Sequence, residues 1–286
     1  MLIIVGFLVG TVSIIVGYTA HHGNLAVLFQ WTEIVIIVGA GVGALLISTP
    51  MTVIKDIAKQ VTHAMKAKEP AKEEYMEVLL LLYELCKTAK ANPLSLEPHV
   101  ENPENSDIFK RYPGVLHNHH AVHFICDTLK VQLSTGMSPY DLEELMDLDI
   151  RTVHDQELKA PVAVNTLSDA FPGLGIVAAV LGVVITMGKL TQGKEVIGQS
   201  VAAALVGTFM GILLCYGYVG PLAQKMTANI GIEGIYLNLI KSCLLAYAKN
   251  CSPKVCVEFS RRALPPHVRP TFEEVDKATS SAGKAA

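Results

Sequence analysis

Four long stretches of the chain consist of apolar and small residues without a single Asp, Glu, Lys or Arg. They cover about 2–19, 34–54, 170–188 and 196–224. A helix needs roughly 20 apolar residues to cross about 30 Å of hydrocarbon, whereas a barrel strand needs only about half that number. The pattern therefore predicts an all-α membrane protein with four transmembrane helices, arranged as two hairpins.

The region between the second and third stretches has a helical period instead. Apolar stripes at i, i+3, i+4 and i+7 spacing begin at Met76, Val122 and Leu142, which predicts three amphipathic helices. Gly136 is placed to end the second of these helices, and Ser138 to begin the third. This region is thus expected to be a helical domain.

These patterns divide the chain into four parts. They are a first transmembrane hairpin (1–54), a helical domain (55–168), a second transmembrane hairpin (169–226) and a C-terminal helix with its tail (227–286). Within the helical domain, residues 92–114 are rich in Asn, Pro and charge and are expected to form an exposed loop. The polar ending from Ala278 is expected to be disordered.

Lysine and arginine are distributed unevenly among the connecting segments. Many follow the second and fourth stretches: Lys55, Lys59, Lys66, Lys68, Lys72, Lys225, Lys241, Lys249, Lys254, Arg261, Arg262 and Arg269. The turn at 21–24 has none, and the turn after the third stretch has only Lys189 and Lys194. Because cytoplasmic segments retain Lys and Arg, the helical domain and both termini are expected in the cytoplasm.

Composition excludes several classes of function. A chain that is 51% hydrophobic and 17% charged is unusual for a soluble protein, and its net charge of -3 argues against nucleic acid as a partner. The cysteines form no C-x-x-C pair, so neither a zinc site nor a disulfide is expected. No nucleophile–base pair, metal set or phosphate loop indicates an enzyme or a cofactor.

Three of the predicted spans contain glycines four residues apart. The pairs are Gly6 with Gly10, Gly39 with Gly43, and Gly207 with Gly211. In lipid, such spacing lets helix backbones approach closely. Packing within the chain and contacts between subunits explain it equally well.

Few polar groups lie inside the second hairpin. Pro172 opens the third span and Pro221 closes the fourth, and each frees a backbone carbonyl near the same boundary. The hydroxyls of Thr186 and Thr208 are the main polar groups at depth, and Asp169 lies only at the inner mouth. Because Glu33 is likewise expected only at the outer mouth of span two, a partner must supply any deep carboxylate.

A histidine cluster comprises His117, His119, His120 and His123. His119 and His123 have the i, i+4 spacing of metal ligands, but no Cys or carboxylate joins them at ligand spacing. A polar helix face is the preferred interpretation.

Several runs are specific enough to compare with known families. They are 33–41, 101–103, 146–147, FPGLGIVAAVLGVV (171–184), VGTFMGILL (206–214), 221–223 and 269–272. With these runs, the chain resembles the MotA family of bacterial flagellar stator subunits up to about residue 276.

The resemblance implies a role and an assembly. About five copies would surround two copies of a MotB-like, single-span partner that carries the ion-binding Asp and anchors to peptidoglycan. The complex would lie in the bacterial inner membrane. Pro172 and Pro221 would couple ion passage to movement, and Thr208, with Thr186 and Asp169, would belong to the ion path. Sodium-driven relatives have Thr where this chain has Ala179, so protons are the expected coupling ion.

The resemblance also implies a contact with the rotor protein FliG. The family's positive and negative contact positions correspond to Lys90 and Glu97, and Lys87 is an alternative cation. The family usually has Arg at the first position, so Lys90 is a departure. Lysine offers a point charge and lacks the bidentate fork of Arg. The helix end at Lys87 and Lys90 also favours cations without any partner.

Two alternatives to a stator remain. An ExbB- or TolQ-like proton-driven energiser of outer-membrane processes belongs to the same broad class, but those relatives have one span before the cytoplasmic domain and two after it. A non-conducting membrane scaffold is the other alternative, and the pairing of Pro172 with Pro221 argues against it.

Overall fold

A computed structural model describes residues 2–66, 69–189, 191 and 193–282. These residues are almost entirely helical and contain no strand. The chain divides into two compact units, a first unit of Met1–Ala67 and Gln156–Ile230 and a second unit of Lys68–Asp155 and Gly231–Ala286. In the described part, four helices are long and apolar enough to cross a membrane, so the expected all-helical membrane fold is confirmed.

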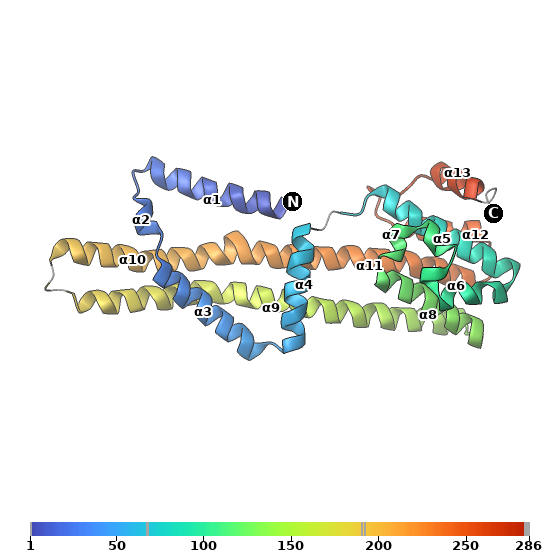
Figure 1. Cartoon of the computed structure of the whole chain (residues 1–286), viewed down its shortest axis with the longest axis horizontal. Coiled ribbons are helices and arrows are strands. Elements are labelled where there is room, and N and C mark those ends of the chain that lie inside the picture. The colour runs from blue at the N-terminus through green and yellow to red at the C-terminus, as the bar shows by residue number, and fades with distance from the viewer. Residues whose placement is uncertain (1, 67–68, 190, 192, 283–286) are drawn as a thin grey trace. The chain divides into compact units, whose positions relative to one another are not determined.

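The first unit contains the predicted spans (Figure 1). Its elements are α1 (Leu2–Ala20), α2 (Leu25–Leu28), α3 (Trp31–Ser48), α4 (Met51–Lys66), the later part of α9 (Pro139–Met187), α10 (Lys194–Ile212), the π-helical segment η5 (Leu213–Val219) and the start of α11 (Gly220–Ala248). The third and fourth spans are therefore parts of longer helices.

The second span differs from the expected 34–54. Helix α3 begins at Trp31 and ends at Ser48, and Thr49 is extended with φ -125° and ψ 127°. Pro50 explains the break, because its ring disfavours the helical conformation of the residue before it. A new helix, α4, then begins at Met51.

Helix α4 runs across the direction of its neighbours in the first unit (Figure 1). Its Val53 and Ala64 are buried with Ala160 of α9 and Met226 of α11. Lysines along α4, such as Lys59, are exposed. An apolar face against the helices and a cationic outer face suit a helix at the membrane surface.

Glycines bring α9 and α10 into backbone contact. A Cβ atom on Gly211 would lie 2.5 Å from the Phe171 carbonyl oxygen, and one on Gly175 would lie 2.8 Å from the Gly207 carbonyl oxygen. The Gly207 and Gly211 pair therefore packs within the chain.

The other two glycine pairs behave differently. Gly6 and Gly10 of α1, and Gly39 and Gly43 of α3, have no described atom within 4 Å of the position that a Cβ would take. These glycines make no close packing inside the described chain, so their flat surfaces are available for contacts between subunits.

The second unit has a single large core. Its helices are α5 (Lys72–Ala91), α6 (Glu97–Glu101), α7 (Pro113–Leu116), α8 (His119–Thr135), α12 (Pro253–Ala263) and α13 (Phe272–Ala282), with the start of α9 and the rest of α11. Short 3₁₀ turns lie at Pro93–Leu96, Pro103–Asn105 and Phe109–Arg111. Buried core residues include Leu82 of α5, Ile125 of α8 and Leu239 of α11.

The second unit confirms some of the local predictions made from the sequence and contradicts one. Gly136 ends α8 with φ +61°, as expected. The Asp141 amide donates to Ser138 Oγ at 3.2 Å, and that hydroxyl donates to the Asp141 carboxylate at 2.6 Å. The prediction of an exposed loop at 92–114 is wrong, because this segment forms short helices and helical turns that bury side chains such as Phe109.

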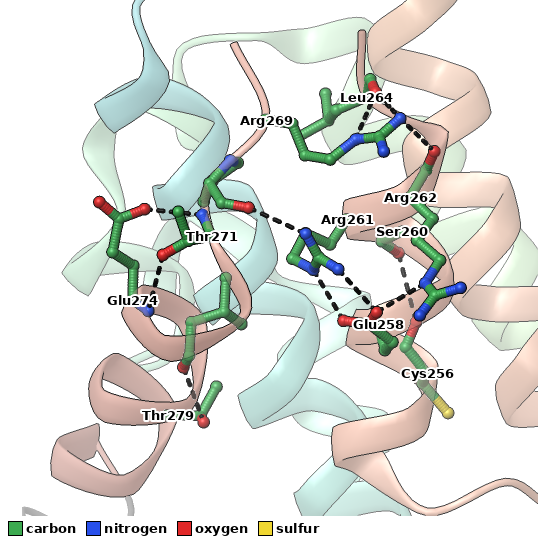
Figure 2. Close-up of polar contacts among 12 residues, drawn as sticks. Cys256, Glu258, Ser260, Arg261, Arg262, Leu264, Arg269, Thr271, Glu274 and Thr279 are labelled. Atoms are coloured by element: carbon green, nitrogen blue, oxygen red, sulfur yellow. Dashed lines mark hydrogen bonds and ion pairs between the residues drawn. The ribbon is translucent and has the colours of Figure 1, made fainter. Parts of the chain in front are cut away.

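Two arginines hold the C-terminal segment of the second unit by hydrogen bonds and an ion pair (Figure 2). Arg261 binds both carboxylate oxygens of Glu258 at 2.7 Å and donates to the Pro270 carbonyl at 3.1 Å. Arg269 donates to the Leu264 carbonyl at 2.6 and 2.9 Å. The chain is thereby turned between α12 and α13.

Helix α13 contradicts the expected disorder from Ala278. It begins behind a reciprocal cap in which the Thr271 amide donates to Glu274 at 2.7 Å and the Glu274 amide donates to the Thr271 hydroxyl at 3.3 Å. Thr279 is buried on its inner face. The helix continues to Ala282, and residues 283–286 lie outside the described part.

Replacing Gly211 by Ala tests the backbone contact. A methyl group there would meet backbone atoms, so Gly211→Ala is expected to destabilise the protein by about 1–3 kcal/mol. The control is Gly198→Ala in the same helix, where the methyl group meets no described atom. Thermal unfolding in detergent measures both, and equal midpoints for the two variants would contradict the packing.

The contact between Glu258 and Arg261 makes the stability of the C-terminal segment depend on pH. Arg261 first, and Arg262 as well, lower the pKa of the Glu258 carboxyl from its ordinary 4.5 to about 2. A depressed pKa stabilises the fold above the ordinary value, and this stabilisation is lost as pH falls from about 4.5 towards about 2.

Glu258→Gln is therefore expected to cost about 1–2 kcal/mol near neutral pH. The difference from the parent protein should shrink as the pH falls through that window. Urea unfolding across pH measures the effect, with the exposed Glu144→Gln as the control. A pH-independent difference would exclude the charged contact as its cause.

Candidate ion path and hinge site

Two prolines interrupt the hydrogen bonding of long helices in the first unit. Pro172 lies inside α9, and Pro221 is the second residue of α11. Helix α9 continues through Pro172, and η5 runs directly into α11 at Pro221, so neither predicted end of a span is a break in the helical course. Proline lacks the N–H that a helix requires, so Pro172 leaves the carbonyl of Ser168 without its usual donor.

Ser168 connects the two proline regions. Its hydroxyl, which is buried, donates to the Cys215 carbonyl at 3.0 Å. Cys215 lies in η5, the π-helical segment directly before Gly220 and Pro221. The same Cys215 carbonyl accepts the Gly220 amide, as the wider π-helical turn permits.

The bond from Ser168 therefore joins the turn that Pro172 weakens to the segment that precedes Pro221. Sequence reasoning missed this residue. The signal that could have found it is a hydroxyl residue four positions before a proline in a transmembrane helix. Ser and Thr side chains near such a proline often make hydrogen bonds to backbone groups.

The predicted ion-path residues lie at different levels of the first unit. A Cβ on Gly207 would be 3.3 Å from the Ala179 amide nitrogen, so Ala179 and the adjacent Thr208 lie at the same level. Thr186 is buried further along α9 and donates its hydroxyl to the Gly182 carbonyl at 2.8 Å.

Asp169 lies near the opposite end of the transmembrane part of α9. It is exposed and accepts a hydrogen bond from Asn165 at 3.0 Å. The structure therefore places Ala179 and Thr208 at the same level and leaves Thr186 and Asp169 at other levels.

Glu33 departs most from its expected position. It was placed only at an outer mouth, yet a Cβ on Gly207 would lie 3.0 Å from Glu33 Oε2 and 3.2 Å from Ala178 Cβ. The α9–α10 hairpin extends past α2 and the start of α3 (Figure 1). The N-terminal end of α3 therefore meets the middle of the hairpin.

The histidine cluster lies in the second unit. His119 and His120 open α8, and His120 and His123 line a cavity of about 220 Å³ together with Asp127 and Asp149. Among the described residues, no three His, Cys, Asp or Glu side chains are arranged to hold a metal ion. The cluster forms a polar face of α8.

The expected rotor-contact residues also lie in the second unit. Lys90 is exposed, and its ammonium donates to the carbonyls of Cys251 at 3.2 Å and Asn250 at 3.4 Å. Glu97 is exposed in the first turn of α6. The Lys90 ammonium is thus held by the backbone beyond the end of α11, and Glu97 is open to solvent.

Lys87 has a different environment. It is exposed and lines a cavity of about 410 Å³ that also includes Arg111 and Glu84. Arg111 binds Glu84 at 3.0 Å. Sequence reasoning missed Arg111, although the adjacent pair Lys110 and Arg111 in the polar segment was a signal for it.

Two family models match this chain. Residues 4–93 match the motility protein A N-terminal model, and residues 117–233 match the MotA/TolQ/ExbB proton channel family. The chain is 36% identical to motility protein A of Escherichia coli K12 over 97% of this chain and 94% of that protein. It is 34% identical to the chemotaxis protein LafT of Vibrio parahaemolyticus, covering 95% and 96%.

Solved structures support the fold. The structure of MotAB of C. jejuni matches with a TM-score of 0.76 and 19% identity, covering 92% of this chain and 95% of that one. The flagellar MotAB stator complex of Bacillus subtilis matches with a TM-score of 0.75 and 20% identity, covering 93% and 96%. The resemblance found in the sequence is confirmed, and the chain belongs to the motility protein A family within the MotA/TolQ/ExbB proton channel family.

Proposed function

We propose that this chain is the stator subunit that converts ion flow into torque in a bacterial flagellar motor. Its partner would be a MotB-like, single-span subunit that carries the ion-binding Asp and anchors to peptidoglycan. The solved relatives are MotAB complexes, which supports such a partner. The complex would lie in the inner membrane with both termini in the cytoplasm.

The bond between Ser168 and Cys215 carries this proposal. A membrane subunit that performs work must transmit a small change at one helix to another. One charge crossing 100 mV releases only about 2.3 kcal/mol, so each step has to move few contacts. The Ser168 bond ties the region of Pro172 to the segment before Pro221, and its making and breaking is on that energy scale.

Protons are the proposed coupling ion. A bound sodium ion requires oxygen ligands in place of its hydration shell. Ala179 offers no side-chain oxygen for this purpose. A proton needs only one accepting group.

The rotor contact is proposed on the second unit, with FliG as the partner. Lys87, Lys90 and Glu97 are all exposed there. Lys87 is favoured over Lys90 as the main cation, because the Lys90 ammonium is already bonded to backbone carbonyls. Arg111 lines the same cavity as Lys87, but its guanidinium is already paired with Glu84, so Lys87 is the proposed contact there.

About five copies are proposed to surround the partner's spans. The glycine surfaces of α1 and α3, with no described atom near Gly6, Gly10, Gly39 or Gly43, support close contact between neighbouring subunits. An ExbB- or TolQ-like energiser is disfavoured, because two of the membrane-length helices precede the helical domain.

Deleting the gene tests the proposed function. Cells tethered by a flagellum should stop rotating and should recover when the gene is restored. In the restored strain, a protonophore should stop rotation, and removal of sodium should have no effect. Continued rotation after deletion would refute the stator assignment, and a requirement for sodium would refute the assignment of the ion.

Removing the Ser168 hydroxyl tests the hinge connection. Ser168→Ala is expected to lower stall torque several-fold, because the Pro172 region loses its bond to the Cys215 carbonyl. Torque on tethered cells should be measured at equal membrane levels of the protein. The control is Thr227→Ala, which removes a hydroxyl that donates only within its own helix, to Ala223. Equal torque in the two variants would dismiss the connection.

A further inference from the structure

Glu33 is a buried acid in a helix long and apolar enough to cross a membrane. It lies in the first turn of α3, and the residue is only 7% exposed. Its Oε2 atom is inaccessible to water and has no hydrogen-bond partner among the described residues. A carboxyl group in this state requires either a proton or a ligand.

The ordinary explanation for an acid in a first turn does not account for Glu33. Such residues usually accept hydrogen bonds from the free amides at the start of their own helix. Glu33 Oε2 accepts none among the described residues, and the Gln30 side chain does not cap the helix either. The carboxyl group is directed towards α9 and α10 instead.

A glycine makes the space that Glu33 occupies. A methyl group on Gly207 of α10 would approach Glu33 Oε2 to 3.0 Å and the Ala178 methyl group of α9 to 3.2 Å. Any larger side chain at Gly207 would displace the carboxyl group. The pocket is therefore formed by small residues of both helices.

The elements around Glu33 offer no opposite charge. Neither 171–187 of α9 nor 196–212 of α10 contains Asp, Glu, Lys, Arg or His, and Glu33 is the only such residue in α3. The nearest residues along the chain that could titrate, His21 and His22, lie in the turn before α2. No described residue neutralises Glu33 by an ion pair.

The carboxyl group lies at the level of the proposed ion path. The position that a Cβ on Gly207 would take is 3.0 Å from Glu33 Oε2 and 3.3 Å from the Ala179 amide nitrogen, and Thr208 follows Gly207 in sequence. We propose that Glu33 is a second proton-binding group of the complex, supplied by this chain in addition to the partner's Asp. It takes up a proton from the outer side, holds it as a neutral carboxylic acid, and returns it to the path. This inference rests on the proposed function.

Isosteric replacement tests the proposal in the complete complex with its partner. Proton flux into liposomes is measured across a range of external pH for the parent, Glu33→Gln and Glu33→Asp complexes. Glutamine keeps the shape but binds no proton, so flux should fall on the order of tenfold or more. Aspartate keeps a titrating group, so flux should persist with a shifted pH profile. The exposed Glu195→Gln in α10 is the matched control and should behave like the parent.

Infrared spectroscopy of the same complexes supplies a readout independent of flux. The carbonyl band of a protonated carboxylic acid should be present in the parent, absent in Glu33→Gln and shifted in Glu33→Asp. Parent-like flux and pH profile in Glu33→Gln, or no band assignable to Glu33, would overturn the proposal. If Glu33→Gln fails to assemble, an unchanged pH profile in Glu33→Asp would overturn it. A parent complex without flux would instead refute the proposed function.

Discussion

The backbone contact between α9 and α10 is the constraint on which the first unit depends. Lipid gives helices no hydrophobic reason to associate, so they must gain packing and close dipole contacts instead. Gly175, Gly207 and Gly211 let the two backbones approach because none of them carries a side chain. Once the two backbones touch, the level of each residue in one helix determines its neighbour in the other. The opposition of Ala179 and Gly207, and the space for Glu33, both follow from this register.

Much of the fold was predictable because a hydrocarbon layer imposes a simple rule on sequence. A span must be long and free of charge, and α1 and α10 are easily recognised on that basis. Caps were equally readable, since Gly136 and Ser138 act through their own local backbone. The family resemblance extended this reading to the role of the chain.

Depth and continuity could not be predicted in the same way. The break at Pro50 is a local effect that a charge-free window overlooks. The continuity of α9 through Pro161 and Pro172 depends on tertiary packing that replaces the lost hydrogen bonds. The depth of Glu33 depends on the stagger between α3 and the α9–α10 hairpin, which no property of α3 alone reveals. Ser168 was missed for a related reason, because its partner lies 47 residues away in the chain.

The two prolines inside α9 have a mechanical consequence. Pro161 and Pro172 both lie in the part of α9 that belongs to the first unit, about three turns apart at 3.6 residues per turn. The two missing N–H groups therefore lie on the same face of the helix. Bends at the two prolines add in one direction instead of cancelling, so a small change at each gives a larger change in the direction of the helix over about 16 Å.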